Sequence, residues 1–159
     1  MIMDVKLEIV KESIITSPKR ISTGEIYFQF EEFSFPERQW NDFIDVILNW
    51  WIIEIIDFIQ NHKTNCSLMF MDGPFHIEIT RSKNNKNTLD LVLLQDHTNN
   101  WNKEIQVSAD DLINALKIST NELLRYCHSN NLTSDAFEQL RINYKKLQNL
   151  GRSLPEPNR

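Results

Sequence analysis

The stretch from Phe35 to Ile59 constrains the fold most, because it concentrates bulky apolar side chains at helical spacing and holds three of the four tryptophans. Apolar residues recur every three or four positions along one line, which is typical of a helix with a buried face: Trp40, Ile44, Ile47, Trp51, Ile55 and Phe58. A neighbouring line predicts a second buried face: Phe43, Val46, Trp50 and Ile53. We therefore expect a core helix, and not a platform on which bases or sugars stack.

The expected start of this helix is Pro36. A proline suits the first helical turn because its missing N–H costs nothing there. Glu37 favours the positive end of the helix dipole, and Ser34 is a candidate cap. Asp42 and Asp45 fall on the remaining polar strip, so we expect both carboxylates to face solvent.

Strands are predicted on both sides of the helix. Residues 5–10 and 26–30 alternate apolar and polar side chains, which is typical of half-buried strands. Four later segments predict an antiparallel meander, over residues 67–71, 75–80, 88–95 and 101–107. The Asp72-Gly73 pair is a hairpin signal, and we expect a positive φ at Gly73.

Two helices are predicted at the C-terminal end. Ser108 has the position of a helix cap, with acidic residues in the first turn after it. A second helix runs from about Ser134 to Gly151, after a polar break. The order ββαββββαα predicts an α+β fold, with an antiparallel sheet packed against the long tryptophan-rich helix and the two C-terminal helices. Residues 1–152 are expected to form a single domain, and residues 153–159 a frayed tail.

Composition narrows the function classes. The 22 acidic and 17 basic residues give a formal charge of −5, which argues against nucleic acid and favours a basic partner. The helix is too short and too often interrupted by polar residues to span a membrane, and no secretory signal opens the chain. We expect a soluble cytoplasmic protein. Cys66 and Cys127 lack redox or zinc spacing, so we expect buried free thiols.

The four histidines lie in four different predicted elements, so no metal site is expected. His62 and His97 are expected in loops, and His128 at the end of a helix. His76 differs because alternation places it beside Glu78, and such a pair suits a general base. No nucleophile motif, phosphate loop or carboxylate pair accompanies it, and the chain has only three glycines. We therefore expect neither an enzyme nor a cofactor.

Alternation also gathers polar side chains on one face of the predicted sheet, opposite its apolar residues. If the helices cover only the apolar face, the polar face is open and acidic. It is then either a solvated surface or a docking surface for a basic protein. The candidate partner-binding residues are His76, Glu78, Asp90, Asp96 and Glu104.

Two strings in the sequence carry a resemblance to known proteins. The first is Phe35-Pro36-x-x-x-Trp40-x-Asp42-Phe43 with Trp50-Trp51 after it, and the second is Phe70-Met71-Asp72-Gly73-Pro74-Phe75. They resemble small bacterial proteins of toxin and immunity loci, over roughly residues 25 to 80. The resemblance implies an immunity protein of a polymorphic toxin or contact-dependent growth inhibition system, which binds its toxin one to one as a monomer. It carries over no binding residue.

Toxins of this kind are commonly basic nucleases, so an acidic inhibitor gains steered association. The alternative is an acidic secretion chaperone, which would hold an effector protein unfolded and would dimerise. A third hypothesis is a hydrolase that uses His76 and Glu78, which would turn over substrate without a partner.

Overall fold

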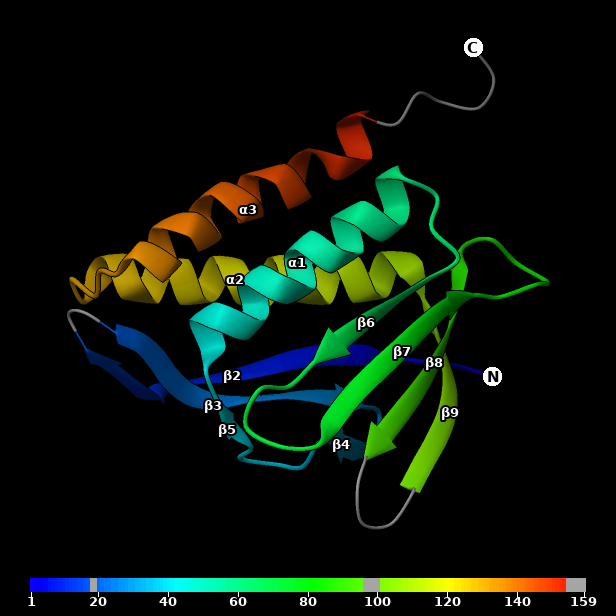
Figure 1. The fold of residues 1–159 in the computed structure, drawn as a ribbon, viewed down its shortest axis with the longest axis horizontal. Helices are drawn as coiled ribbons and strands as arrows, with labels where there is room; N and C mark the ends of the chain where they lie inside the picture. The colour runs from blue at the N-terminus through cyan, green and yellow to red at the C-terminus, as the bar shows by residue number, and fades with distance from the viewer. Residues whose placement is uncertain (18–19, 96–100, 154–159) are drawn as a thin grey trace.

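The computed structural model describes residues 1–17, 20–95 and 101–153 (Figure 1). Within them lie three helices: α1 (Ile44–Gln60), α2 (Ala109–Ser129) and α3 (Asp135–Ser153). Helices α1 and α2 pack against strands, and α3 packs against α1 and α2. The predicted α+β class, with antiparallel strands and two C-terminal helices, is confirmed. The strands divide between two sheets, where the sequence led us to expect one.

The first sheet, termed the meander sheet, contains the four strands predicted after the helix. They are β6 (Asn65–Met69), β7 (Phe75–Arg81), β8 (Thr88–Gln95) and β9 (Trp101–Ser108), each antiparallel to the next. The short strand β1 (Ile2–Met3) adds in parallel to β9. The sheet order is therefore β1-β9-β8-β7-β6, with β1 and β6 at the edges.

The second sheet, termed the N-terminal sheet, contains the two predicted early strands in longer form. These are β2 (Val5–Ser17) and β3 (Arg20–Phe30), which pair antiparallel. Two short strands also pair with β3: β4 (Phe33–Phe35) and β5 (Asn41–Asp42). Because nothing in the described chain pairs with its other side, β2 is an edge strand.

Helix α1 holds the two sheets together through Trp51. The indole of Trp51 is fully buried. Its ring centroid lies 5.2 Å from that of Phe28 in β3 and 5.1 Å from that of Phe70, the residue after β6. Its Nε1 donates to the Met69 carbonyl at 2.8 Å, which satisfies an outward-facing group of the edge strand β6. The first apolar line of the helix is therefore core from Ile44 onward, as predicted.

The start of α1 differs from the prediction. The helix begins at Ile44, and the segment after the cis Phe35-Pro36 bond forms a turn and β5 instead. The side chain of Ser34 does not cap this helix, and neither does that of Phe43, which occupies the cap position. Tertiary pairing overrides the local signal here, because β5 pairs with β3 and a buried carboxylate holds this segment in place.

The second apolar line of α1 was predicted to be buried, and this was wrong. Trp50 is 44% exposed and Ile53 is 51% exposed. Helix α3 instead packs beside Asn49, whose side chain donates to the Ala136 carbonyl at 3.1 Å and accepts from Asn143 at 2.7 Å. The half-buried Asn49 and the buried Asn143, which no apolar pattern includes, therefore mark the side of α1 that α3 covers.

The hairpin between β6 and β7 is confirmed, but the expected positive φ at Gly73 is wrong. Glycine is required there for space instead. A Cβ atom at Gly73 would lie 2.6 Å from Cη2 of Trp40.

The C-terminal helices begin as predicted. The Ser108 side chain caps α2 by accepting from the Asp111 N–H at 3.3 Å, and Ser134 accepts from the Phe137 N–H at 3.1 Å just before α3. Helix α3 continues through Gly151, where an end was expected, to Ser153. Of the predicted tail, residues 154–159 lie outside the described residues. No described helix is both long and apolar enough to cross a membrane.

Candidate protein-docking face

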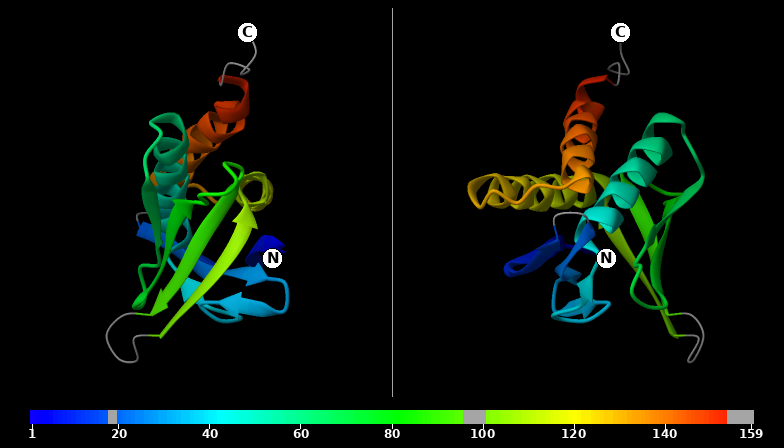
Figure 2. Two further views of the ribbon diagram at one scale, coloured as in Figure 1. Left: turned by 90° about the vertical axis from the view of Figure 1, so that its right-hand side faces the viewer. Right: turned by 60° about the vertical axis from the view of Figure 1, so that its left-hand side comes forward.

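The two faces of the meander sheet differ completely. One face packs into the core through residues such as Leu68, Ile77, Leu91 and Ile105. The other, termed the open face, carries Ser67, Met69, His76, Glu78, Thr80, Asp90, Val92, Leu94, Asn102, Glu104 and Gln106. In the left view of Figure 2 this sheet lies in front, and none of the three helices covers it. The condition for an open polar face, helices on the apolar side alone, is therefore met.

Strand register brings the predicted carboxylates together. Glu78 and Glu104 lie opposite Val92 from its two sides, and Asp90 lies opposite Thr80 and Gln106 in the next row. Since neighbouring strands are about 4.8 Å apart, Glu78 and Glu104 stand about 10 Å from each other. Four of the five predicted residues thus share one surface; the fifth, Asp96, lies outside the described residues.

Polar partners on the open face are neutral or weakly basic. Glu78 accepts from the Ser67 hydroxyl at 2.8 Å, and His76 Nε2 lies 3.4 Å from the Glu78 Oε1 atom. Asp90 accepts from the Gln106 amide at 2.7 Å. Ser67 and Gln106 are neutral donors, so they hold Glu78 and Asp90 in place without cancelling their charge. Glu104 is exposed, so all three acids remain available to a cation.

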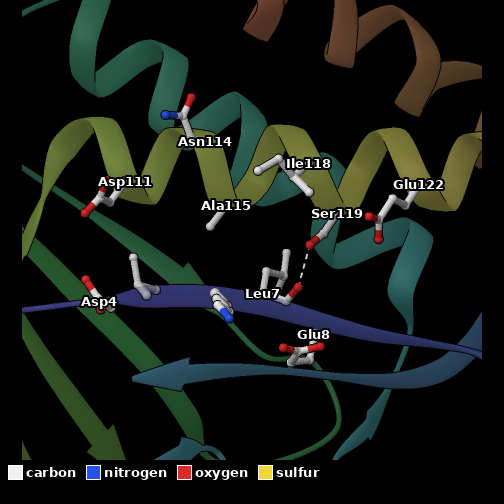
Figure 3. A pocket seen from close by; sticks show the side chains of 11 residues that line it. Asp4, Leu7, Glu8, Asp111, Asn114, Ala115, Ile118, Ser119 and Glu122 are labelled. Carbon is white, nitrogen blue, oxygen red and sulfur yellow. Dashed lines mark hydrogen bonds between the residues drawn. The ribbon is translucent and has the colours of Figure 1, made fainter. Parts of the chain in front are cut away.

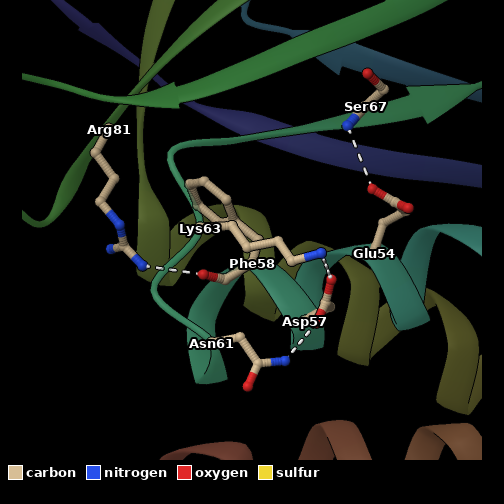
Figure 4. A network of polar contacts seen from close by, with 7 residues as sticks. All are labelled: Glu54, Asp57, Phe58, Asn61, Lys63, Ser67 and Arg81. Atoms are coloured by element: carbon tan, nitrogen blue, oxygen red, sulfur yellow. Dashed lines mark hydrogen bonds and ion pairs between the residues drawn. The ribbon is translucent and has the colours of Figure 1, made fainter.

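The basic residues of the same strands lie off this face. Arg81 places its guanidinium 4.7 Å from the centroid of the Phe58 ring, and Lys103 places its ammonium 4.0 Å from that of Phe33. Arg81 also donates to the Phe58 carbonyl at the end of α1 (Figure 4). In the same network, Lys63 pairs with Asp57 at 2.6 Å. Within the described strands, the open face has carboxylates but no lysine or arginine.

Half-exposed apolar side chains accompany the acids, and sequence reasoning missed them. Val92 and Leu94 are half-buried among the polar side chains of the face, and Met69 lies exposed at its β6 edge. Ile2 is exposed on β1, opposite Gln106. The signal was present, because alternation gives these residues the same orientation as the acids. Protein interfaces commonly combine apolar contacts with such polar groups.

The histidines of the described chain lie apart from one another. His62 lies in the turn after α1 and His128 in the last turn of α2, while His97 lies outside the described residues. His76 has Glu78 beside it, and its side chain is only 12% exposed. No group of three or more His, Cys, Asp or Glu residues in the described parts of the chain could hold a metal ion.

Both thiols are free and buried, as predicted. Burial raises the pKa of Cys66 to about 12 and that of Cys127 to about 11. The thiolate is the nucleophilic form of cysteine, so neither side chain is a good nucleophile at neutral pH.

Asp42 was expected to face solvent, and it is fully buried. Its carboxylate accepts four hydrogen bonds: from the Trp40 indole at 2.9 Å and from the backbone N–H groups of Phe43, Met71 and Asp72 at 2.7, 3.1 and 3.2 Å. The two strings that carry the resemblance therefore meet in one unit, termed the clasp: Trp40, Asp42 and residues 70–75. Their function is to hold the fold together.

Asp45 was also expected to face solvent and is fully buried. It accepts from the backbone N–H groups of Ser22 at 2.8 Å and Val46 at 2.9 Å. Burial raises the pKa of this carboxyl above its ordinary value despite these bonds. Asp42 and Asp45 therefore form no part of a docking surface.

Comparisons of the chain with protein-family models, curated proteins and solved structures found no match.

Proposed function

We propose that the protein is an immunity protein, which binds a basic bacterial toxin domain through the open face of the meander sheet and thereby neutralises it. The observation that carries the proposal is the open face itself. It holds Glu78, Asp90 and Glu104 without a compensating lysine or arginine from its strands, beside exposed apolar residues. The resemblance of the two strings to proteins of toxin and immunity loci supports the same function. The protein acts in the cytoplasm, as a monomer bound one to one.

The charge distribution suits a basic protein partner. Like charges on one surface steer an oppositely charged partner toward it and raise the association rate. Apolar contacts at Val92, Leu94 and Met69 would then slow dissociation, because most differences in affinity lie in the dissociation rate. An inhibitor of this kind needs no reacting group, no cofactor and no nucleic-acid contact.

The experiment is protection of a sensitive bacterial host that expresses the toxin domain encoded beside this chain. We expect the parent protein to restore growth and the double variant Glu78→Lys/Glu104→Lys to lose most of that protection. The matched control, Glu12→Lys/Glu32→Lys, changes the net charge equally at two exposed residues away from the open face, and should protect like the parent.

The complex of this chain with the toxin domain also distinguishes an immunity protein from a secretion chaperone. Light scattering on the purified complex should give one copy of each protein, with the toxin domain folded. A dimer of this chain around an unfolded client would contradict the proposal, and so would a lack of protection by the parent protein.

A further inference from the structure

A groove of about 490 Å³ lies between β2 and α2, away from the open face (Figure 3). Its strand side comes from residues 4–8, and its helix side from residues between Asp111 and Glu122. The strand is the free edge of the N-terminal sheet, so the helix takes the place that a further strand would occupy. The side chain of Ser119 links the two, because its hydroxyl donates to the Leu7 carbonyl.

The groove exists because the helix presents small side chains to the strand. Ala115 and Ser119 lie one turn apart, and both are buried against β2. Leu7 is buried beneath them, whereas Ile118 beside them is 60% exposed. Figure 3 shows Leu7, Ala115 and Ile118 in the middle part of the groove. One large apolar side chain in the middle of the groove, Ile118, therefore has no cover in the described chain.

Both ends of the groove are acidic. Asp4 and Asp111 lie at one end, and Glu8 and then Glu122 lie past Leu7 toward the other (Figure 3). A single lysine, Lys6, also lines the groove, and strand alternation places it between Asp4 and Glu8. Four carboxylates against one ammonium favour a cationic occupant with charge at both of its ends.

The spacing of the acidic pairs fits an extended peptide. From Asp4 to Glu8 the strand advances about 13 Å, and from Asp111 to Glu122 the helix advances about 16 Å. In an extended chain, residues i and i+4 lie about 13 Å apart on one face, with residue i+2 between them. An occupant with basic residues at i and i+4 and an apolar residue at i+2 therefore matches the acidic ends and the exposed Ile118 between them.

We propose that the groove between β2 and α2 binds an extended segment of a partner protein with the pattern basic-x-apolar-x-basic. This site is separate from the open face and does not rest on the function proposed above. Recognition comes from the side chains of Asp111, Glu122 and Ile118 on the helix, and of Asp4 and Glu8 on the strand.

The test uses the peptide acetyl-Gly-Arg-Ser-Leu-Ser-Arg-Gly-amide, titrated into the isotopically labelled full chain at low salt and followed by the backbone amide signals. We expect saturable shifts in residues 4–8 and 111–122 below 1 mM peptide. A control peptide with serine in place of leucine should bind more weakly. Shifts confined to residues 76–106, or no saturable shifts at 1 mM, would overturn the proposal.

Variants separate the groove from general attraction to an acidic protein. Asp111→Asn/Glu122→Gln removes two ion pairs and should weaken binding about fivefold, and Ile118→Ser should weaken it about threefold. The matched controls are Glu78→Gln/Glu104→Gln on the open face and Ile142→Ser, a 50% exposed isoleucine of α3. Both should bind like the parent. Equal affinity in the groove variants and the parent, with intact amide spectra in all, would overturn the assignment.

Discussion

The buried carboxylates before and within α1 and the exposed carboxylates of the open face are the same chemical group in opposite roles. Asp42 is fully buried and accepts four hydrogen bonds, three of them from backbone N–H groups. Glu104 is exposed on β9, and Glu78 on β7 accepts from one serine hydroxyl. A carboxylate whose donors all come from its own chain stabilises the fold, whereas one that faces solvent with few donors can still bind a partner.

Burial has a cost that the bonds of Asp42 offset. An ionised carboxylate without partners is expensive to bury, and donors aimed at it recover that free energy. The donors to Asp42 come from the segment before α1 and from the loop between β6 and β7, so the carboxylate joins two distant parts of the chain. The printed donors to Glu78 and Asp90 on the open face come from a neighbouring strand, and substitution of the exposed carboxylates there should change stability little.

The largest effect should come from Asp42→Ala. It leaves four donors of the clasp without their acceptor, and removal of one partner from a buried charged network costs about 3–5 kcal/mol. Denaturant unfolding measures the change, with Glu104→Ala as the exposed control. A loss below about 1 kcal/mol for Asp42→Ala would mean that the clasp does not hold these elements together.

A smaller loss, about 1–3 kcal/mol, is expected for Gly73→Ala, because the added methyl would overlap the Trp40 ring. Gly73→Asn should be no milder, since the constraint is space and not a positive φ. In a Trp40→Leu background, the alanine substitution should cost less than in the parent. Equal costs in both backgrounds, measured by thermal or denaturant unfolding, would show that Trp40 is not the obstacle.

The pH dependence of the free energy of unfolding should include a contribution from protonation of Asp45. Its folded pKa lies above the unfolded value, so the native state holds the proton more tightly. Its contribution to stability is therefore fully present below the ordinary pKa of aspartate and falls as pH rises through the folded pKa. Asp45→Asn should remove this fall from the curve of unfolding free energy against pH. Curves that differ only by a constant offset would contradict the shift.

The smallest effect should come from Glu78→Gln/Glu104→Gln. Both side chains face solvent, and such substitutions usually change stability by less than about 0.5 kcal/mol. A change above 1 kcal/mol in denaturant unfolding would mean that the open face serves the fold, and the contrast with Asp42 would then fail.

The sequence could predict what local patterns control. Alternation gave the strands of the meander and the shared face of Glu78 and Glu104, and Ser108 marked the start of α2. The burial of Asp42 could not be predicted, because two of its four donors come from residues 29 and 30 positions away. Local rules likewise favoured a helix at Pro36, and pairing of β5 with β3 overrode them.

The groove between β2 and α2 could not be predicted from the sequence either. Its two walls are separated by about a hundred residues, and only the placement of α2 along the edge of β2 brings their acids together. Surfaces formed by long-range packing leave no local signal.

Binding kinetics between this chain and the toxin domain that the proposed function expects in a neighbouring gene test the central claim most directly. For Glu78→Lys/Glu104→Lys, we expect slower association than in the parent and a weaker dependence of the association rate on salt. The control Glu12→Lys/Glu32→Lys, with the same net charge, should associate more nearly like the parent. Equal slowing in both variants would contradict a docking role for the open face.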